Sequence, residues 1–368
     1  MEWLVTFLID WPNKKNGDKC RMPAERKGLD EFHKGKGLKA FEKLIFLGFF
    51  SILVGGVPMI SQIFGAFLPI PLCMVFLIYG RKVGGVFSLA LLGVLIFLHS
   101  LTQSTPAPLP LMLYGLGLSL VIGEFVKRKA HPVRAFLFGG FSLFMVLGFF
   151  LFFSETFFDF SVRGEVEKNV MSVVKHYKTG PGAEFLAQGG EGTRFIKDII
   201  EKPKNYVEQV MSWIPSAIFT TFFLSWWANF YLILRNESIW RSSEKDYPFS
   251  LNDFLKFRVG DIFIWPLIAA LGLFLGGEFL LGDFGVIIGK NLLVCLGVFY
   301  FFQGFGLLID FLVYAKVFGM VRMLIFLSMI SFGMLSGVFL AILGVLDNFK
   351  DFRKSFKKKS NDDEGDRL

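Results

Sequence analysis

The chain has 368 residues, and its 39 Lys and Arg residues against 31 Asp and Glu residues give it a formal net charge of +8. Apolar residues make up 53% of the chain and charged residues only 19%, whereas about a quarter of an ordinary soluble domain is charged. The apolar residues occur in blocks of about 17 to 25, the length of a helix that crosses a bilayer. The composition therefore excludes an ordinary soluble protein and predicts an all-α, polytopic transmembrane helix bundle.

Few residues of the chain suit metal or covalent chemistry. Cys20, Cys73 and Cys295 are too scattered for a disulfide framework or a structural zinc site. The histidines are far apart, and neither a metalloprotease nor a nucleophile-elbow motif is present. The stretch from Gly285 to Asn291 is an incomplete phosphate loop, because it is too short and lacks the Mg²⁺-binding hydroxyl. We expect no metal, no cofactor, no catalytic residue, no ATPase activity of the chain's own and no nucleic-acid partner.

Residues 1–43 are predicted to form a cytoplasmic segment. Trp3, Phe7 and Trp11 recur at helical spacing in a stretch too short to span, which predicts an interfacial helix. A hydrophobic end without helix is the alternative. The following residues, up to Lys43, are polar and rich in Lys and Arg, so they should stay in the cytoplasm.

Nine candidate spans then follow, at residues 44–60, 63–80, 83–101, 109–126, 132–153, 212–234, 262–281, 285–315 and 323–346. They predict an N-terminal membrane bundle over 44–153 and a C-terminal one over 212–346. The first two candidates are separated only by Ser61 and Gln62, so they form either a tight hairpin or a broken helix. The eighth candidate is longer than a bilayer requires.

Residues 154–211, between the two bundles, are predicted to be an extracytoplasmic helical cap. Two amphipathic patterns are separated by a glycine-rich segment at 180–192. The apolar positions expected to face protein or headgroups are Val166, Val170, Val173, Phe195 and Ile199. The cap is either a lid over a cavity or a connector that rests on the headgroups.

Basic loops indicate the orientation of the chain. They all fall on one side when the N-terminus is cytoplasmic, and a short amphipathic helix that begins near Ser250 should lie flat on that side. Nine crossings would place the basic residues from Lys350 to Lys359 outside, which is unfavourable. We therefore expect an even number of crossings and a charged cytoplasmic tail at 347–368, with the error either in region 44–80 or at the start of the eighth candidate.

Four stretches of the chain resemble a known family. They are Phe67-Leu-Pro69-Ile-Pro71-Leu before Tyr79-Gly80-Arg81; Phe254 to Trp265-Pro266; Asn291 with Phe302-Gln303-Gly304-Phe-Gly306; and Leu343-Gly344-Val-Leu-Asp347 with Asp351-Phe352-Arg353-Lys354. Over about residues 40–354 the chain resembles the YybS-like family of predicted bacterial membrane proteins, a domain of unknown function. It departs from the family at Gly260-Asp261, where a proline is usual, and in its first 40 residues.

The resemblance implies a function by analogy. The family is considered distantly similar to the substrate-binding S components of energy-coupling factor transporters, which capture vitamins or metal ions and work with separate ATPase and coupling subunits. It implies a multi-pass protein of the bacterial cytoplasmic (inner) membrane, with the lipid bilayer, a small-molecule solute and those subunits as partners. It also implies that the small-residue face of Ser51 and Gly55 docks the coupling partner. Packing within the chain is the other reading of that face.

Gln303 and Asp310 form a polar stripe on the eighth candidate span. They lie seven residues apart, so they share one helix face with Gly306 and are about 10 Å apart along it. A carboxylate in hydrocarbon is costly, so Asp310 should face the bundle or a wet cavity. Gln303 should be hydrogen-bonded across helices.

Lys290 and Asn291, at the outer end of the same helix, would extend this stripe into a polar track. Lys290, Asn291, Gln303 and Asp310 are therefore the candidate ligand-binding residues. The alternative is that Asp310 is a helix-end charge beside the basic residues that follow the helix, and that Gln303 only joins helices.

Three functions remain open on the sequence. The first is a solute-binding protein of the S-component type, with a cavity on the outer side under residues 154–211 and no chemistry of its own. The second is a non-catalytic membrane scaffold that recruits or assembles partner proteins. The third is an intramembrane enzyme that acts on lipid, for which the acidic residues of the chain are too scattered.

Overall fold

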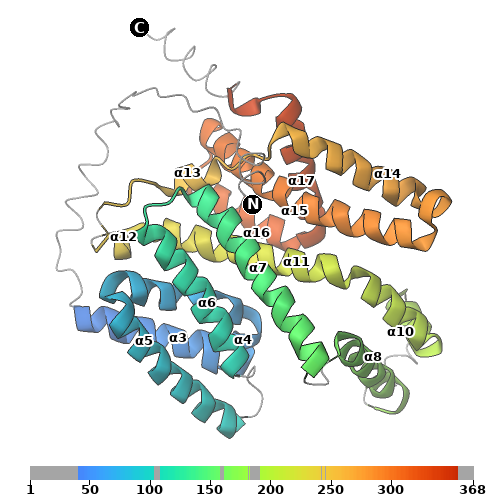
Figure 1. Ribbon diagram of the computed structural model, residues 1–368, viewed down its shortest axis with the longest axis horizontal. Coiled ribbons are helices and arrows are strands. Elements are labelled where there is room, and N and C mark those ends of the chain that lie inside the picture. The colour runs from blue at the N-terminus through green and yellow to red at the C-terminus, as the bar shows by residue number, and fades with distance from the viewer. Residues whose placement is uncertain are drawn as a thin grey trace. The chain divides into compact units, whose positions relative to one another are not determined.

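The computed structural model describes residues 40–102, 108–157, 161–180, 182, 191–241, 243, 244 and 246–354. Every regular element within these residues is a helix (Figure 1). The predicted all-α bundle is therefore confirmed. The predicted N-terminal interfacial helix, Cys20 and the tail beyond residue 354 lie outside the described residues.

The chain forms two compact units. The first holds the described residues up to Gly139 together with Ser225–Phe254, and the second holds Gly140–Leu224 together with the described residues from Leu255 onward. The helices are α3 (Ala40–Gly56), α4 (Pro58–Phe64), η1 (Gly65–Phe67), α5 (Pro69–Thr102), α6 (Pro108–Lys127), α7 (Pro132–Phe157), α8 (Val162–Thr179), α10 (Glu191–Glu201), α11 (Pro203–Arg235), α12 (Glu237–Trp240), α13 (Leu251–Leu255), η2 (Asp261–Phe263), α14 (Ile264–Leu281), α15 (Asp283–Tyr314), α16 (Gly319–Ser331) and α17 (Gly333–Phe349).

The number of candidate spans in the structure differs from the expected eight or nine. Among the described residues, six helices are long and apolar enough to cross a bilayer, and a seventh span results if α16 and α17 together count as one. The difference has two sources. Helix α3 has only 17 residues, and the candidates 63–80 and 83–101 are counted together as one helical stretch of 37 residues, Gly65–Leu101.

Helix α5 folds back on itself at Gly80 (Figure 1). Gly80 has φ 80° and ψ 177°, a backbone conformation that glycine tolerates and other residues rarely adopt. Leu72 and Leu91, on either side of it, share one buried cluster with Val54 of α3. They would be about 28 Å apart along a straight helix. The two halves of α5 therefore lie side by side, as the two candidate spans would.

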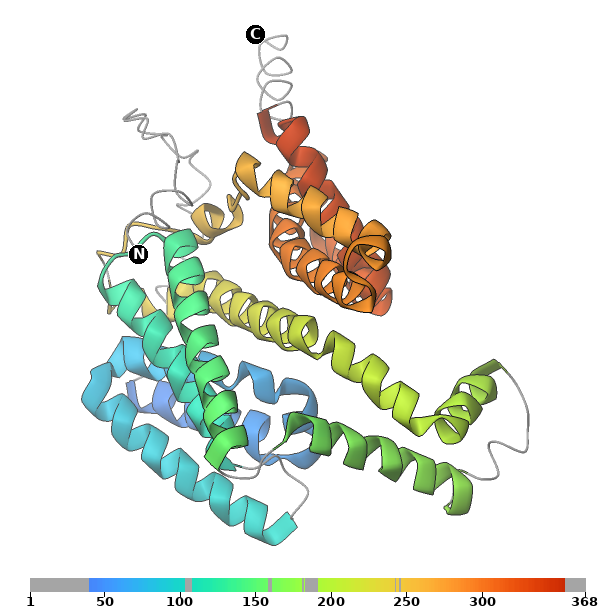
Figure 2. The same ribbon diagram turned by 45° about the vertical axis from the view of Figure 1, so that its right-hand side comes forward.

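The two helices predicted for residues 154–211 are present as α8 and α10, which pack with the first turns of α11 (Figure 2). Val170, Ile199 and Val207 are buried between them. The side chains of Val173 and Phe195 are 40% and 59% exposed. Of the two predicted surroundings, protein or headgroups, only headgroups remain for them. Most of the glycine-rich segment 180–192 lies outside the described residues, and the side of the membrane that the two helices occupy stays a prediction.

Helices α14 and α15 of the second unit form a tight hairpin, and α17 lies beside α15 (Figure 2). A single residue, Gly282 with φ +62°, connects the first two. Glycines let the hairpin close: a Cβ on Gly289 would lie 2.4 Å from the backbone nitrogen of Phe274. The pair Gly272 and Gly276, which has packing spacing in the sequence, faces open space, because a Cβ added to either would have no atom within 4 Å.

The ninth candidate span is a bent pair of helices. The helix axis bends by 109° at Phe332, between α16 and α17. The pair begins at Gly319, just after the end of α15. It ends before Arg353, whose Nε lies 3.5 Å from the carboxylate of Asp310, also near the end of α15. The pair thus starts and finishes at the same end of α15, as a re-entrant pair does.

We predict that the C-terminus lies in the cytoplasm, because a re-entrant α16–α17 pair adds no crossing and returns the basic tail to the side of the other basic loops. A reporter that is active only outside the cytoplasm should be silent when fused after Leu368. The same reporter fused after Gly282, in the turn on the predicted outer side, should be active. Strong activity after Leu368 would contradict the prediction.

Candidate functional site

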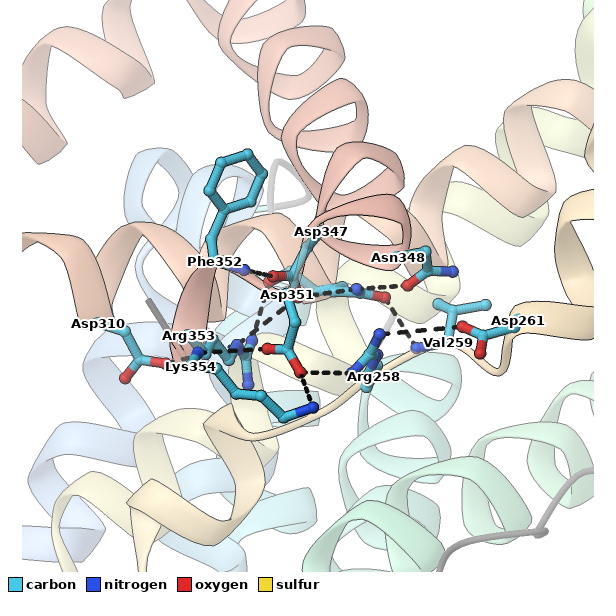
Figure 3. Close-up of polar contacts among 11 residues, drawn as sticks. Arg258, Val259, Asp261, Asp310, Asp347, Asn348, Asp351, Phe352, Arg353 and Lys354 are labelled. Atoms are coloured by element: carbon cyan, nitrogen blue, oxygen red, sulfur yellow. Dashed lines mark hydrogen bonds and ion pairs between the residues drawn. The ribbon is translucent and has the colours of Figure 1, made fainter. Parts of the chain in front are cut away.

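Polar side chains of the second unit gather at one end of α15 (Figure 3). They come from the loop before α14, from α15 itself and from the residues at and after the end of α17. We call this group the Gln303 cluster; its members are Arg258, Val259, Asp261, Gln303, Asp310, Asp347, Asn348, Asp351, Phe352, Arg353 and Lys354.

Glycines bring the three segments together. A Cβ on Gly304 would lie 1.9 Å from the carbonyl oxygen of Leu340, and one on Gly344 would lie 2.0 Å from the carbonyl oxygen of Tyr300. Helices α15 and α17 therefore touch backbone to backbone. Gly306 lets the loop before α14 approach the backbone of α15 equally closely, since a Cβ on Gly306 would lie 2.2 Å from the carbonyl oxygen of Leu255.

The Gln303 amide joins all three segments. The Val259 N–H donates to Gln303 Oε1 at 2.8 Å. Gln303 Nε2 donates to Asp347 Oδ2 at 3.0 Å and to Asn348 Oδ1 at 2.8 Å. Both amide hydrogens and the amide oxygen are therefore used in a fully buried position. The prediction that Gln303 is hydrogen-bonded across helices is confirmed.

Asp347 is the carboxylate at the centre of the cluster. Its side chain is 1% exposed, and among the described residues it is the only fully buried one that carries a carboxylate or a basic group. Besides Gln303, its partners are the N–H of Phe352, which donates at 3.2 Å, and Nε of Arg353 at 3.8 Å. A buried carboxylate is costly unless it is paired and hydrogen-bonded, and these groups compensate it.

Arg353 lies along the polar stripe of α15. Its guanidinium donates to the carbonyl oxygen of Gln303 at 3.2 Å, and its Nε is 3.5 Å from Asp310. A Cβ on Gly306 would lie 2.8 Å from the same guanidinium. The predicted stripe of Gln303, Gly306 and Asp310 is therefore one continuous face. The Arg353 side chain is 16% exposed and that of Asp310 is 46% exposed, so Asp310 faces the cluster and remains accessible.

The rim of the cluster is a second set of ion pairs. Asp351 lies 3.4 Å from Arg258 and 2.9 Å from Lys354. Partial burial by itself raises the pKa of the Asp351 carboxyl, but hydrogen bonds from Lys354 and the charges of Lys354 and Arg258 together hold that pKa below its ordinary value. Asp351 is therefore ionised at neutral pH.

Lys290 and Asn291 serve a different contact of the second unit. Asn291 Oδ1 accepts from the Ser216 N–H at 2.9 Å, and its Nδ2 donates to the Ser212 carbonyl at 2.8 Å. A regular helix would pair those two backbone groups, but they flank Pro215 inside α11. Asn291 thus supports the helix at its proline. Lys290 donates to Ser212 Oγ at 2.5 Å and lies over the Trp213 ring.

The structure therefore divides the four candidate ligand residues into two pairs. Gln303 and Asp310 share the Gln303 cluster, whereas Lys290 and Asn291 contact α11. The two pairs lie on different faces, because a separation of 12 residues, from Asn291 to Gln303, corresponds to about 18 Å of rise and a rotation of about 120°. The predicted continuous polar track does not form.

The small-residue face of α3 is used within the first unit. Ser51 is fully buried and donates to the Leu47 carbonyl at 2.7 Å. A Cβ on Gly55 would lie 3.3 Å from Leu95 and 3.6 Å from Leu68. The chain's own helix α5 thus covers the face that was a candidate for partner docking, so the alternative reading, packing within the chain, describes it.

Two open cavities, of about 260 and 350 Å³, are lined by α5 and α6 in the first unit. Both include Phe76, Arg81 and Leu120, and most of each lining is apolar. Arg81 is already paired with Glu124. These cavities offer fewer polar partners to a solute than the Gln303 cluster does.

The site residues predicted from the sequence did not include six charged residues of the cluster: Arg258, Asp261, Asp347, Asp351, Arg353 and Lys354. Asp310 is nearest in the chain to the basic residues that follow its helix, but its ion pair comes from Arg353, on the far side of the α16–α17 pair. One signal was present: Asp347 and Arg353 belong to the stretches that carry the family resemblance. The sequence does not show that the α16–α17 pair folds back and brings Asp347 and Arg353 to α15.

Comparisons with known proteins agree with that resemblance. The profile of a family described as predicted membrane protein (DUF2232) matches residues 44–348. Comparisons with curated proteins and with solved structures gave no match. The matched range includes the helices of both units and ends at Asn348, within the Gln303 cluster. The chain therefore belongs to this family of predicted multi-pass membrane proteins, whose domain is one of unknown function.

Proposed function

We propose that the protein binds a small polar solute at the Gln303 cluster and takes part in its transport, without catalytic or ATPase activity of its own. The observation that carries this proposal is the buried carboxylate of Asp347 at the junction of a bent helix pair with α15. Ionisable groups inside membrane proteins are costly and mark substrate pathways. Transporters also place their binding sites at interrupted helices.

The exposed fraction of Asp310 supports the same reading. A carboxylate that is 46% exposed, beside an arginine that is 16% exposed, offers a solute both an acceptor and a charge-assisted donor. This end of α15 is the cytoplasmic one according to the basic loops. We therefore expect the working site at the inner end of a solute pathway and not under the outer cap of residues 154–211.

We also infer that the protein lies in a bacterial cytoplasmic membrane and works, as S components do, with separate coupling and ATPase subunits. The non-catalytic scaffold remains the second candidate, because Lys354 and Asp261 at the rim are 84% and 81% exposed and present charges to a partner protein. The intramembrane enzyme is the least supported candidate.

Native mass spectrometry of gently purified protein tests the proposal. Wild-type protein should carry a bound small molecule, and the Asp310→Asn variant should retain about tenfold less of it, because it loses the charged partner of the solute. Asp283→Asn, at the exposed first turn of α15, is the matched control and should bind as the wild type does. Stoichiometric protein partners without a small molecule would favour the scaffold, and turnover of bound lipid would favour the enzyme.

A further inference from the structure

A groove runs along the first unit between α6 and the half of α5 that follows Gly80. The two cavities lined by these helices share Phe76, Arg81 and Leu120, so they are neighbouring parts of this one groove. Phe76 comes from the other half of α5 and is buried, so it lies at the floor of the groove. The larger cavity, of about 350 Å³, is within the size range of ligand sites.

Glycines leave the groove unfilled. Gly85 lines it from α5 and Gly123 lines it from α6. A Cβ added to either glycine would have no atom within 4 Å, although Gly123 is buried. The space beside these two positions is therefore not occupied by side chains of the unit itself.

The lining of the groove is apolar along most of its length. Along α5 it extends from Arg81 to Leu92, and along α6 it extends from Lys127 to Met112. These stretches are about 16 and 22 Å long, and the hydrocarbon of one leaflet is about 15 Å thick. Leu89, at the edge of the groove, is 72% exposed. The groove thus opens sideways, and in a bilayer an acyl chain is what an apolar opening of this kind meets.

The charged side chains of the lining are confined to one end. They belong to Arg81, Glu124 and Lys127. Glu124 is paired with both Arg81 and Arg128, and Lys127 forms no ion pair within the described part of the chain. The Arg81 side chain is 67% exposed, so its guanidinium has donors left for a further acceptor. Three cations against one carboxylate make this end of the groove positive.

We propose that the groove binds one anionic phospholipid, with the phosphate at Arg81 and Lys127 and one acyl chain along α5 as far as Leu92. Arginine and lysine bind phosphate through charge-assisted hydrogen bonds. Basic pockets between membrane helices on the cytoplasmic side bind anionic lipid headgroups, and the loops that hold Arg81 and Lys127 are among the basic ones predicted to lie on that side.

The apolar part and the charged part of the groove select this ligand together. A zwitterionic lipid would place an ammonium group beside the positive end, which is unfavourable. A free phosphate ion would leave the apolar part of the groove uncovered. All the lining residues belong to the first unit, so the proposal does not depend on the function proposed for the Gln303 cluster.

Native mass spectrometry of the full chain in detergent, titrated with phosphatidylglycerol or with phosphatidylcholine of the same acyl chains, tests the proposal. Wild-type protein should bind one phosphatidylglycerol about tenfold more tightly than phosphatidylcholine. Lys127→Gln removes a charge without breaking a described ion pair, and it should weaken the binding of phosphatidylglycerol about fivefold. Lys316→Gln, at an exposed position just after α15, is the matched control and should bind as the wild type does.

Gly85→Leu tests the apolar part of the groove. The leucine side chain would displace at least two methylene groups of the acyl chain, so the affinity for phosphatidylglycerol should fall about tenfold. Gly93→Leu is the matched control, because a Cβ on Gly93 also has no atom within 4 Å but Gly93 lines neither cavity. This variant should bind the lipid as the wild type does.

Equal affinity of wild-type protein for the two lipids would overturn the proposal. So would unchanged binding of phosphatidylglycerol by Lys127→Gln or by Gly85→Leu. Binding of inorganic phosphate as tight as that of phosphatidylglycerol would assign the positive end to a free anion instead. A copurified protein that Gly85→Leu releases would assign the groove to a helix of that partner.

Discussion

Replacement of Gly344 by alanine is expected to destabilise the second unit by about 3 kcal/mol, the upper range for overpacking a tight core. The added Cβ would lie 2.0 Å from the Tyr300 carbonyl oxygen, and its next two neighbours would also be backbone atoms, which cannot give way unless a helix moves. Helices α15 and α17 would have to separate, which would also pull Asp347 away from Gln303. The midpoint of thermal unfolding in detergent measures the effect.

The same two helices supply the controls. A Cβ added to Gly337 on α17 or to Gly297 on α15 would have no atom within 4 Å. Alanine at either position should be neutral or slightly stabilising, because alanine favours helix over glycine by up to about 1 kcal/mol. Gly304→Ala should behave as Gly344→Ala does. If Gly344→Ala were as stable as Gly337→Ala, the backbone contact between the two helices would be wrong.

Gln303→Leu is expected to cost about 3 kcal/mol, although leucine has a similar size and suits lipid better. The change removes the bonds to Val259, Asp347 and Asn348, and it leaves the Val259 N–H and the Asp347 carboxylate with fewer partners in a buried site. Hydrogen bonds between membrane helices are individually worth about 0.6 to 1.7 kcal/mol, and orphaned buried groups add about 1–3 kcal/mol each. Unfolding in detergent at neutral pH measures the loss.

Gln209→Leu, the same substitution at an exposed position of α11, is the matched control and should change stability by less than about 0.5 kcal/mol. Protein abundance in the membrane should follow the same order. A Gln303→Leu variant as stable and as abundant as Gln209→Leu would show that the amide does not hold the loop and α17 to α15.

The helices themselves could be predicted from the sequence because each is a local property. Long apolar blocks specify where the chain is helical in a bilayer, and the amphipathic spacing around Val170 and Ile199 specified the pair α8 and α10. The family resemblance also rested on local stretches. The break at Phe332 was harder to predict, because the chain turns sharply there although the apolar pattern runs through it without interruption. The turn at Gly80, in contrast, falls between two candidate spans, where Arg81 and Lys82 interrupt the pattern.

Only the local half of the candidate site could be predicted from the sequence. Seven residues of helix place Gln303 and Asp310 on one face whatever the rest of the chain does, so their shared stripe followed from the sequence alone. Their partners Asp347 and Arg353 reach that face only because α16 and α17 bend and because Gly304 and Gly344 let two backbones touch. The sequence by itself determined an apolar helical membrane protein with one polar stripe. The tertiary structure decided which charges meet that stripe, since ion pairing depends on distances of a few ångströms between residues far apart in the chain.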